Sequence, residues 1–125
     1  MRINLETAKL AKEKGYDESC SSVFVDGNPK ELGGVQRKNS TYQNQITRPT
    51  QSDLQKWLRE VHNIYVNSDY YHGYPEVRFY YDVKILSDDN YNGNQDSDDN
   101  IYTYEQAMEL GLQEALKLIE DESRS

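Results

Sequence analysis

The sequence predicts an α+β fold: a single domain in which helices pack on one face of a small antiparallel sheet of two or three strands. Residues 50–62 and 103–120 repeat apolar side chains every three to four positions, which is the period of an amphipathic helix. Residues 77–85 alternate apolar and polar side chains, which is typical of an antiparallel strand with one buried face. A chain of 125 residues is long enough for one hydrophobic core, so residues 1–125 are expected to form one domain in the order helix, short strand, helix, strand, strand, helix.

The first predicted helix covers residues 5–14. Asn4 precedes it as an N-cap, and Gly15 follows it at the position where a left-handed residue ends many helices. A helix of about three turns is marginal on its own, so we expect it to dock on larger elements. Its apolar stripe is weak and consists of Leu5, Ala8 and Ala11.

The segment between the first two helices has the weakest pattern in the chain. Residues 22–26 alternate and predict a short strand, which the breakers Gly27, Asn28 and Pro29 end. Residues 27–47 contain few apolar side chains and show no period. We therefore expect a long, poorly patterned loop over residues 27–47.

The second predicted helix starts at Thr50, and Asp53 stands where a capping box usually carries Glu or Gln. Asn63 can end this helix in the left-handed conformation, and residues 64–67 then continue as a strand. Trp57 is the single tryptophan and can bury more area than any other side chain here. It belongs to the apolar stripe of the helix, which consists of Leu54, Trp57, Leu58 and Val61.

The strand over residues 77–85 separates its side chains into two faces, and a tyrosine-rich loop over residues 68–76 leads into it. The apolar face is expected to lie on the core, and it consists of Val77, Phe79, Tyr81, Val83 and Ile85. The other face is expected in water, and it consists of Arg78, Tyr80, Asp82 and Lys84.

The third predicted helix begins after an acidic loop over residues 87–100. Thr103 and Gln106 form a capping box, and the helix is expected to run to about residue 120, before a frayed tail over residues 121–125. Three small residues lie four positions apart on one face, so a neighbouring backbone can approach the helix closely there. They are Ala107, Gly111 and Ala115.

Two stretches of the chain carry a family resemblance: RPTQSDLQKWLREVHNIYV at residues 48–66 and YTYEQAMELGLQEALKLI at residues 102–119. With these motifs and the earlier segment ETAKLAKEKGYDE, the chain resembles a family of small uncharacterised proteins common in phages and prophages of gut anaerobes. Relatives tend to carry an apolar residue where Asp53 stands and a histidine where Tyr65 stands. The resemblance implies a phage-associated origin and a shared fold, and it implies no catalytic residue.

The acidic loop contains a pattern that fits a calcium-binding loop of the EF-hand type. Three features argue against it: Gln95 stands where an apolar residue is expected, the last ligand is Asp rather than Glu, and a strand enters the loop where a helix should. The alternative interpretation is a solvated acidic linker. The candidate calcium ligands, at positions one, three, five, nine and twelve of the loop, are Asp88, Asn90, Asn92, Asp96 and Asp99.

Composition limits the compartment and the partners. The net charge of -8 argues against direct nucleic-acid binding and against docking on an anionic membrane, because both need clustered Lys and Arg. Cys20 is the only cysteine, which is typical of a reducing cytosol. The N-terminus lacks the apolar segment of a signal peptide, and no run approaches the roughly 20 apolar residues of a membrane span. We expect a soluble cytoplasmic protein.

No group of residues points to a reaction. His62 and His72 have no paired cysteine that would make a zinc site, and Cys20 has no activating neighbour in the sequence. Gly33 and Gly34 lack the strand, helix and lysine of a phosphate-binding loop. The sequence therefore predicts a protein without enzymatic activity.

The tyrosines suggest a binding surface instead. Two rings and two cations are expected on the strand face that points away from the core, and Tyr and Arg are enriched at binding hot spots. The predicted surface consists of Tyr65, Arg78, Tyr80 and Lys84. The alternative interpretation is that the first helix or the long loop covers this face, so that the rings serve only for packing. We expect a small accessory protein that contacts another protein or a second copy of itself, through this face or through an open sheet edge. One alternative is an acidic inhibitor or nucleic-acid mimic that acts on a host protein, and another is a calcium-binding module over residues 88–99.

Overall fold

A computed structural model describes residues 1–40, 44–72, 77–86, 94–96 and 103–119 of the chain. It confirms the predicted α+β fold, with helices packed on one face of a small antiparallel sheet. A second small sheet accompanies the first. The elements are α1 (Leu5–Glu13), β1 (Ser22–Val25), β2 (Asn28–Glu31), β3 (Gln45–Thr47), α2 (Gln51–His62), β4 (Ile64–His72), β5 (Val77–Ile85), β6 (Asn94–Asp96) and α3 (Tyr104–Leu118).

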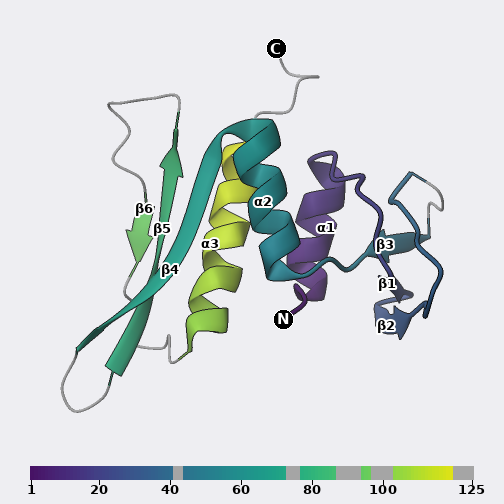
Figure 1. Cartoon of the computed structure of the whole chain (residues 1–125), viewed down its shortest axis with the longest axis horizontal. Helices are drawn as coiled ribbons and strands as arrows, with labels where there is room; N and C mark the ends of the chain where they lie inside the picture. The colour runs from purple at the N-terminus through teal and green to yellow at the C-terminus, as the bar shows by residue number, and fades with distance from the viewer. Residues whose placement is uncertain (41–43, 73–76, 87–93, 97–102, 120–125) are drawn as a thin grey trace.

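The elements form successive layers (Figure 1). The sheet β4-β5-β6 lies at one end, and helices α2 and α3 cover one of its faces. Helix α1 packs on the far side of α3, and the second sheet, β2-β1-β3, lies beyond α1. Within the described ranges no helix is long and apolar enough to cross a membrane.

Side-chain caps define the helix ends as the sequence predicts. The Asn4 side chain accepts a hydrogen bond from the amide of Thr7 at the start of α1, and Thr50 caps α2 in the same way through the amide of Asp53. The capping box of Thr103 and Gln106 is complete at the start of α3. Asn63 ends α2 with a φ of 56°, the left-handed conformation expected there.

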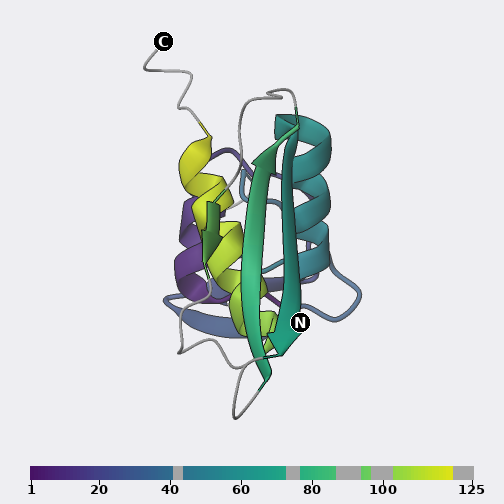
Figure 2. The same cartoon turned by 90° about the vertical axis from the view of Figure 1, so that its left-hand side faces the viewer.

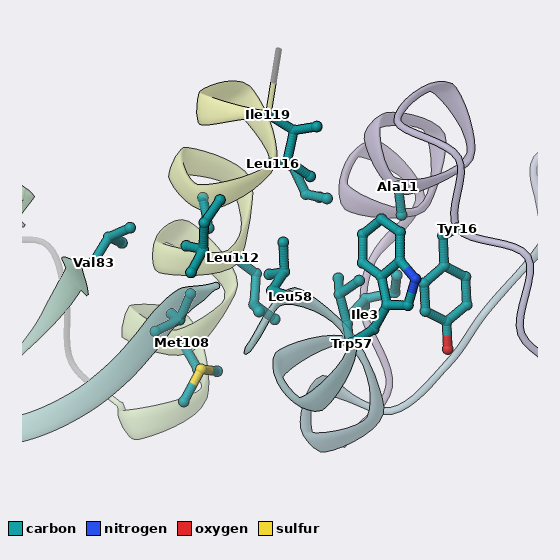
Figure 3. Packing of buried hydrophobic residues seen from close by; sticks show 14 of the residues in the cluster. Ile3, Ala11, Tyr16, Trp57, Leu58, Val83, Met108, Leu112, Leu116 and Ile119 are labelled. Atoms are coloured by element: carbon teal, nitrogen blue, oxygen red, sulfur yellow. The ribbon is translucent and has the colours of Figure 1, made fainter. Parts of the chain in front are cut away.

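The core lies between the large sheet and the helices, and Trp57 belongs to it as predicted. Trp57 is 7% exposed and meets the ring of Tyr16 edge-on at 5.2 Å between centroids (Figure 3). The same cluster contains Val83 and Leu112, with Phe79 partly buried against it. This one cluster joins the helices to the large sheet.

Two predicted core positions are wrong. Val61 is 56% exposed, because it falls at the rim of a surface cleft beside Trp57 rather than against the sheet. Val77 is 42% exposed, because the end of the β4–β5 hairpin projects past the helices (Figure 1). An apolar residue that fits the period of a helix or strand is buried only where a neighbouring element packs against it.

Gly111 allows α3 to approach the sheet closely, as its spacing predicts. A Cβ atom at this position would lie 2.9 Å from Val66 Cγ1 and 3.0 Å from Tyr81 Cβ. Real Cβ atoms do not make contacts this short without a shift of the neighbour. The absence of a side chain at Gly111 therefore sets the distance between α3 and strands β4 and β5.

The prediction of one long loop over residues 27–47 is wrong, because β2 and β3 lie within it. A tight turn at Asp26 and Gly27, with φ of 52° and 82°, joins β1 to β2 and pairs Val25 with Asn28. All four residues of β2 are exposed, so the strand shows no apolar alternation. Its place in the sheet comes from main-chain pairing and from the carboxylate of Glu31, which accepts a hydrogen bond from Ser22 and lies within 4 Å of Arg2 and Arg48.

Polar side chains hold the segments around this small sheet. Asn39, which is buried, donates to the carbonyl of Tyr16 at 2.7 Å and accepts from the amide of Thr47 at 2.8 Å. Arg2 donates to the carbonyl of Arg48 at 2.7 Å. Lys12 of α1 donates to the carbonyl of Gln45 in β3 at 2.8 Å. None of these contacts has a hydrophobic period that a sequence pattern could reveal.

Candidate functional site

One face of the large sheet is covered by helices, and the other has no helix over it among the described residues. Ile64, Val66, Tyr81 and Val83 are buried on the covered face, against α2 and α3. On the other side, no described helix crosses strands β4 and β5, and Figure 2 shows this side of the sheet toward the viewer. Because side chains alternate along a strand, the residues between these buried positions point away from the helices.

The register of β4 and β5 arranges the outward residues in cross-strand rows. Tyr65 lies opposite Lys84, Asn67 opposite Asp82, and Asp69 opposite Tyr80. We call this surface the open face, and its described residues are Tyr65, Asn67, Asp69, Arg78, Tyr80, Asp82 and Lys84. The four residues predicted from the sequence, Tyr65, Arg78, Tyr80 and Lys84, all lie on it. Their shared face is a structural finding, and their binding role stays a prediction.

Two members of the open face, Asn67 and Asp69, were not predicted from the sequence. The predicted strand ended at residue 67, whereas β4 continues to His72 and places Asp69 beside Tyr80. Asn67 was the last residue of the predicted strand and was given no role. The run from Tyr65 to Tyr71 contains polar and aromatic residues without clean alternation, so its length could not be read from hydrophobicity.

Asp82 occupies the middle of the open face and is nearly buried. Its side chain is 14% exposed, and Oδ2 lies 3.4 Å from Nζ of Lys84. The other oxygen, Oδ1, is buried and has no hydrogen-bond partner within the described part of the chain. Because Oδ1 is covered by the chain itself, only the exposed part of the Asp82 carboxylate is available to a donor from outside.

The outer edge of β4 is partly closed. The carbonyl of Asn63 accepts from the amide of Leu86, so by alternation the backbone groups of even-numbered residues in β4 point away from β5. The Gln55 side chain donates to one of these, the carbonyl of Val66, at 2.6 Å. The Asp69 side chain accepts from another, the amide of Tyr70, at 2.8 Å. These contacts disfavour the addition of a strand at this edge, so the face is the better candidate surface.

Most of the candidate calcium ligands lie outside the described residues: Asp88, Asn90, Asn92 and Asp99. Asp96 ends β6, where its backbone pairs with Tyr81. This strand corrects part of the predicted acidic loop over residues 87–100. Among the described residues no group of three His, Cys, Asp or Glu side chains is placed to hold a metal ion. Calcium binding stays a prediction.

The remaining candidate residues have structural surroundings. His62 packs edge-on against Trp57, with 4.7 Å between ring centroids. Cys20 is buried, and its sulfur accepts a hydrogen bond from Arg2 at 3.6 Å.

Comparisons with protein families, with curated proteins and with solved structures find no match to this chain.

Proposed function

We propose that this protein is a non-catalytic binding protein that acts through protein–protein contact, and that the partner which best fits the open face is a second copy of the chain. The observation that carries the proposal is the arrangement of the open face in rows. Each row places chemically complementary side chains on the two neighbouring strands, β4 and β5.

A two-fold axis parallel to the strands exchanges β4 and β5 between two facing copies. Lys84 of one copy then meets Tyr65 of the other, which is a cation–π pair. Tyr80 meets Asp69, so that the phenol can donate to the carboxylate. Asp82 meets Asn67, whose amide group can donate to the exposed part of the carboxylate. Each of the three rows is therefore self-complementary.

The size of the open face sets the expected affinity. Strands β4 and β5 have nine residues each, and at about 3.4 Å per residue and about 4.8 Å per strand the two strands cover roughly 30 Å by 10 Å. This is less than the about 800 Å² that each partner buries in a standard interface. We therefore expect a transient dimer with a dissociation constant in the micromolar range or weaker.

The test is sedimentation velocity over about a hundredfold range of protein concentration, which spans the expected dissociation constant. The wild-type chain is expected to shift from monomer toward dimer as concentration rises. Tyr80→Ala combined with Arg78→Ala removes one ring and one cation from the open face, and it is expected to leave a monomer at every concentration. Circular dichroism of the variant should match the wild type, because neither side chain lies in the core.

A matched control removes the same kinds of group elsewhere. Tyr104 and Lys9 are exposed on α3 and α1, so Tyr104→Ala with Lys9→Ala should dimerise like the wild type. A folded Tyr80→Ala/Arg78→Ala chain that still dimerises, or a wild-type chain that stays monomeric throughout, would contradict the proposal.

The setting of this contact is part of the same proposal. The resemblance of residues 48–66 and 102–119 to phage and prophage proteins supports an accessory role in a phage. The single cysteine supports a reducing compartment such as the cytoplasm.

A further inference from the structure

A cleft of about 370 Å³ lies beside α2, between this helix, the segment of residues 16–19 that follows α1, and Lys38. Its aromatic lining is the pair formed by Tyr16 and Trp57, which meet edge-on (Figure 3). The rest of the lining is exposed and mostly charged: Glu18, Ser19, Lys38, Asp53, Lys56, Glu60 and Val61. The cleft is separate from the open face, because α2 stands between the two surfaces.

The charges of the cleft do not satisfy one another. Three carboxylates, of Glu18, Asp53 and Glu60, face two ammonium groups, of Lys38 and Lys56, yet no ion pair within 4.0 Å joins them in the described structure. The three carboxylates therefore keep their capacity to accept hydrogen bonds from a donor that enters the cleft.

Tyr16 brings a second unsatisfied group to the same cleft. Its side chain is 3% exposed, and no hydrogen bond to its hydroxyl is found among the described residues. Figure 3 shows the hydroxyl at the end of the ring that points away from α1. Burial, followed by the negative charge of Asp53, raises the pKa of this phenol, so the hydroxyl stays neutral at physiological pH. A neutral hydroxyl can accept a hydrogen bond from a cationic donor.

We propose that this cleft binds a guanidinium group. A guanidinium is planar, presents several N–H donors in a rigid fork and is more weakly hydrated than an ammonium group. It can therefore donate to the carboxylates and the phenol while it touches the small exposed part of the Tyr16–Trp57 pair. The two lysines reduce the net negative charge of the cleft, so the affinity of an isolated guanidinium is expected in the millimolar range.

Trp57 reports on binding directly, because it is the only tryptophan in the chain. The probe is N-acetyl-arginine amide, and its matched control is N-acetyl-citrulline amide, which has nearly the same shape without the charge. The arginine compound is expected to change the tryptophan fluorescence in a saturable way, and the citrulline compound to bind at least about ten times more weakly. Backbone amide shifts of Ser19 and Val61 by NMR give a second readout if the fluorescence does not respond.

Three variants test whether the carboxylates of the cleft bind the guanidinium. An exposed ion pair contributes a factor of about 1.4 to 5 in binding, so Asp53→Asn should weaken the arginine compound by about that factor. Glu18→Gln, Asp53→Asn and Glu60→Gln together should weaken it by the product of three such factors, about 3-fold to 100-fold. Glu13→Gln removes an exposed carboxylate of α1 that lies outside the cleft, and it should leave binding unchanged.

Two further ligands identify the source of the group. Equal binding of ethylguanidine and N-acetyl-Gly-Arg-Gly-amide indicates a free small cation, whereas tighter binding of the peptide indicates an arginine presented by a protein. Citrulline and arginine compounds that bind equally, or an absence of both fluorescence and NMR changes with the arginine compound, would falsify the proposal. Neither result bears on the dimer at the open face, which is measured by sedimentation.

Discussion

In the large sheet, strands β4 and β5 are nine residues long, and their buried side chains pack on α2 and α3. In the small sheet, the strands have only three or four residues, and β2 is exposed throughout. The large sheet is held by apolar burial, with Val66 and Val83 fully covered. The small sheet has Val23 and Phe24 as buried apolar residues, and polar side chains such as Asn39 and Arg2 tie its surroundings together. One molecule thus combines two ways of fixing a sheet.

Because different interactions stabilise the two sheets, they should respond differently to substitution. Loss of a core side chain removes transfer free energy and leaves a cavity that the whole cluster shares. Loss of a buried polar side chain leaves its former partners without hydrogen bonds in one place. The first kind of change should lower global stability, and the second should loosen the small sheet before the large one.

The largest effect is expected for Trp57→Ala, because Trp57 joins the core of the large sheet to the segment that carries the small one. Its ring packs edge-on against both Tyr16 and His62. We expect a loss of about 3–5 kcal/mol in the free energy of unfolding, as for other large buried aromatic residues. Urea denaturation followed by circular dichroism measures it, and a loss below about 1 kcal/mol would mean that the ring contributes no more than a surface residue.

An intermediate effect is expected for Asn39→Ala, which removes the two hydrogen bonds to Tyr16 and Thr47. Because these backbone groups would be left without partners, we expect a loss of about 1–3 kcal/mol. Native-state hydrogen exchange should speed up in β1 and β3 and stay unchanged in β4 and β5. Gln36→Ala, at an exposed amide side chain nearby, is the control. Uniform acceleration of exchange in both sheets would show that they unfold as one unit, and it would contradict the expectation that the small sheet opens first.

The smallest effect is expected for Gly111→Ala, in the large-sheet half. Alanine favours a helix by about 1 kcal/mol over glycine, but the new Cβ atom would press on Val66 and Tyr81. Overpacking of a tight core costs about 1–3 kcal/mol, so we expect a net loss of up to about 2 kcal/mol by thermal or urea unfolding. Gly34→Ala, where nothing lies within 4 Å, should be neutral. A stabilised Gly111→Ala chain would mean that α3 can move away from the sheet freely.

The same contrast explains how much of the fold could be predicted from the sequence. The large-sheet half was predictable, because caps at Thr50 and Thr103 and the stripe around Trp57 are local signals that packing then reinforces. Val61 and Val77 were misplaced, since period alone does not say how far a neighbouring element extends. The small sheet was missed for another reason: β2 has no apolar face, and the strand pair β1–β2 depends on a turn.

One signal for that turn was present and was overlooked. Asp26 and Gly27 form the Asp-Gly pair that two-residue hairpin turns favour, and both adopt the positive φ that such a turn needs. Read as a hairpin signal rather than as a break, it predicts β2. By contrast, the partners of Asn39 lie 23 and 8 positions away, and no local rule indicates them.

The candidate site shows the same limits. Alternation along residues 77–85 correctly placed Arg78, Tyr80 and Lys84 on one face, because the period of a strand fixes the side to which each residue points. The rows that make the face self-complementary depend on the register with β4, and the sequence does not contain it. The cleft beside Trp57 was not predicted, because its lining comes from residues 16–19, Lys38 and α2, which only the tertiary fold brings together.

The contact of Gln55 with β4 has a consequence for the behaviour of the chain at high concentration. Fibre growth requires a strand that offers an uninterrupted ladder of main-chain groups to incoming molecules. Here the amide of Gln55 already occupies the carbonyl of Val66, so the ladder is interrupted near the most apolar part of the strand. The side chain of one helical residue therefore protects this edge against the addition of further strands.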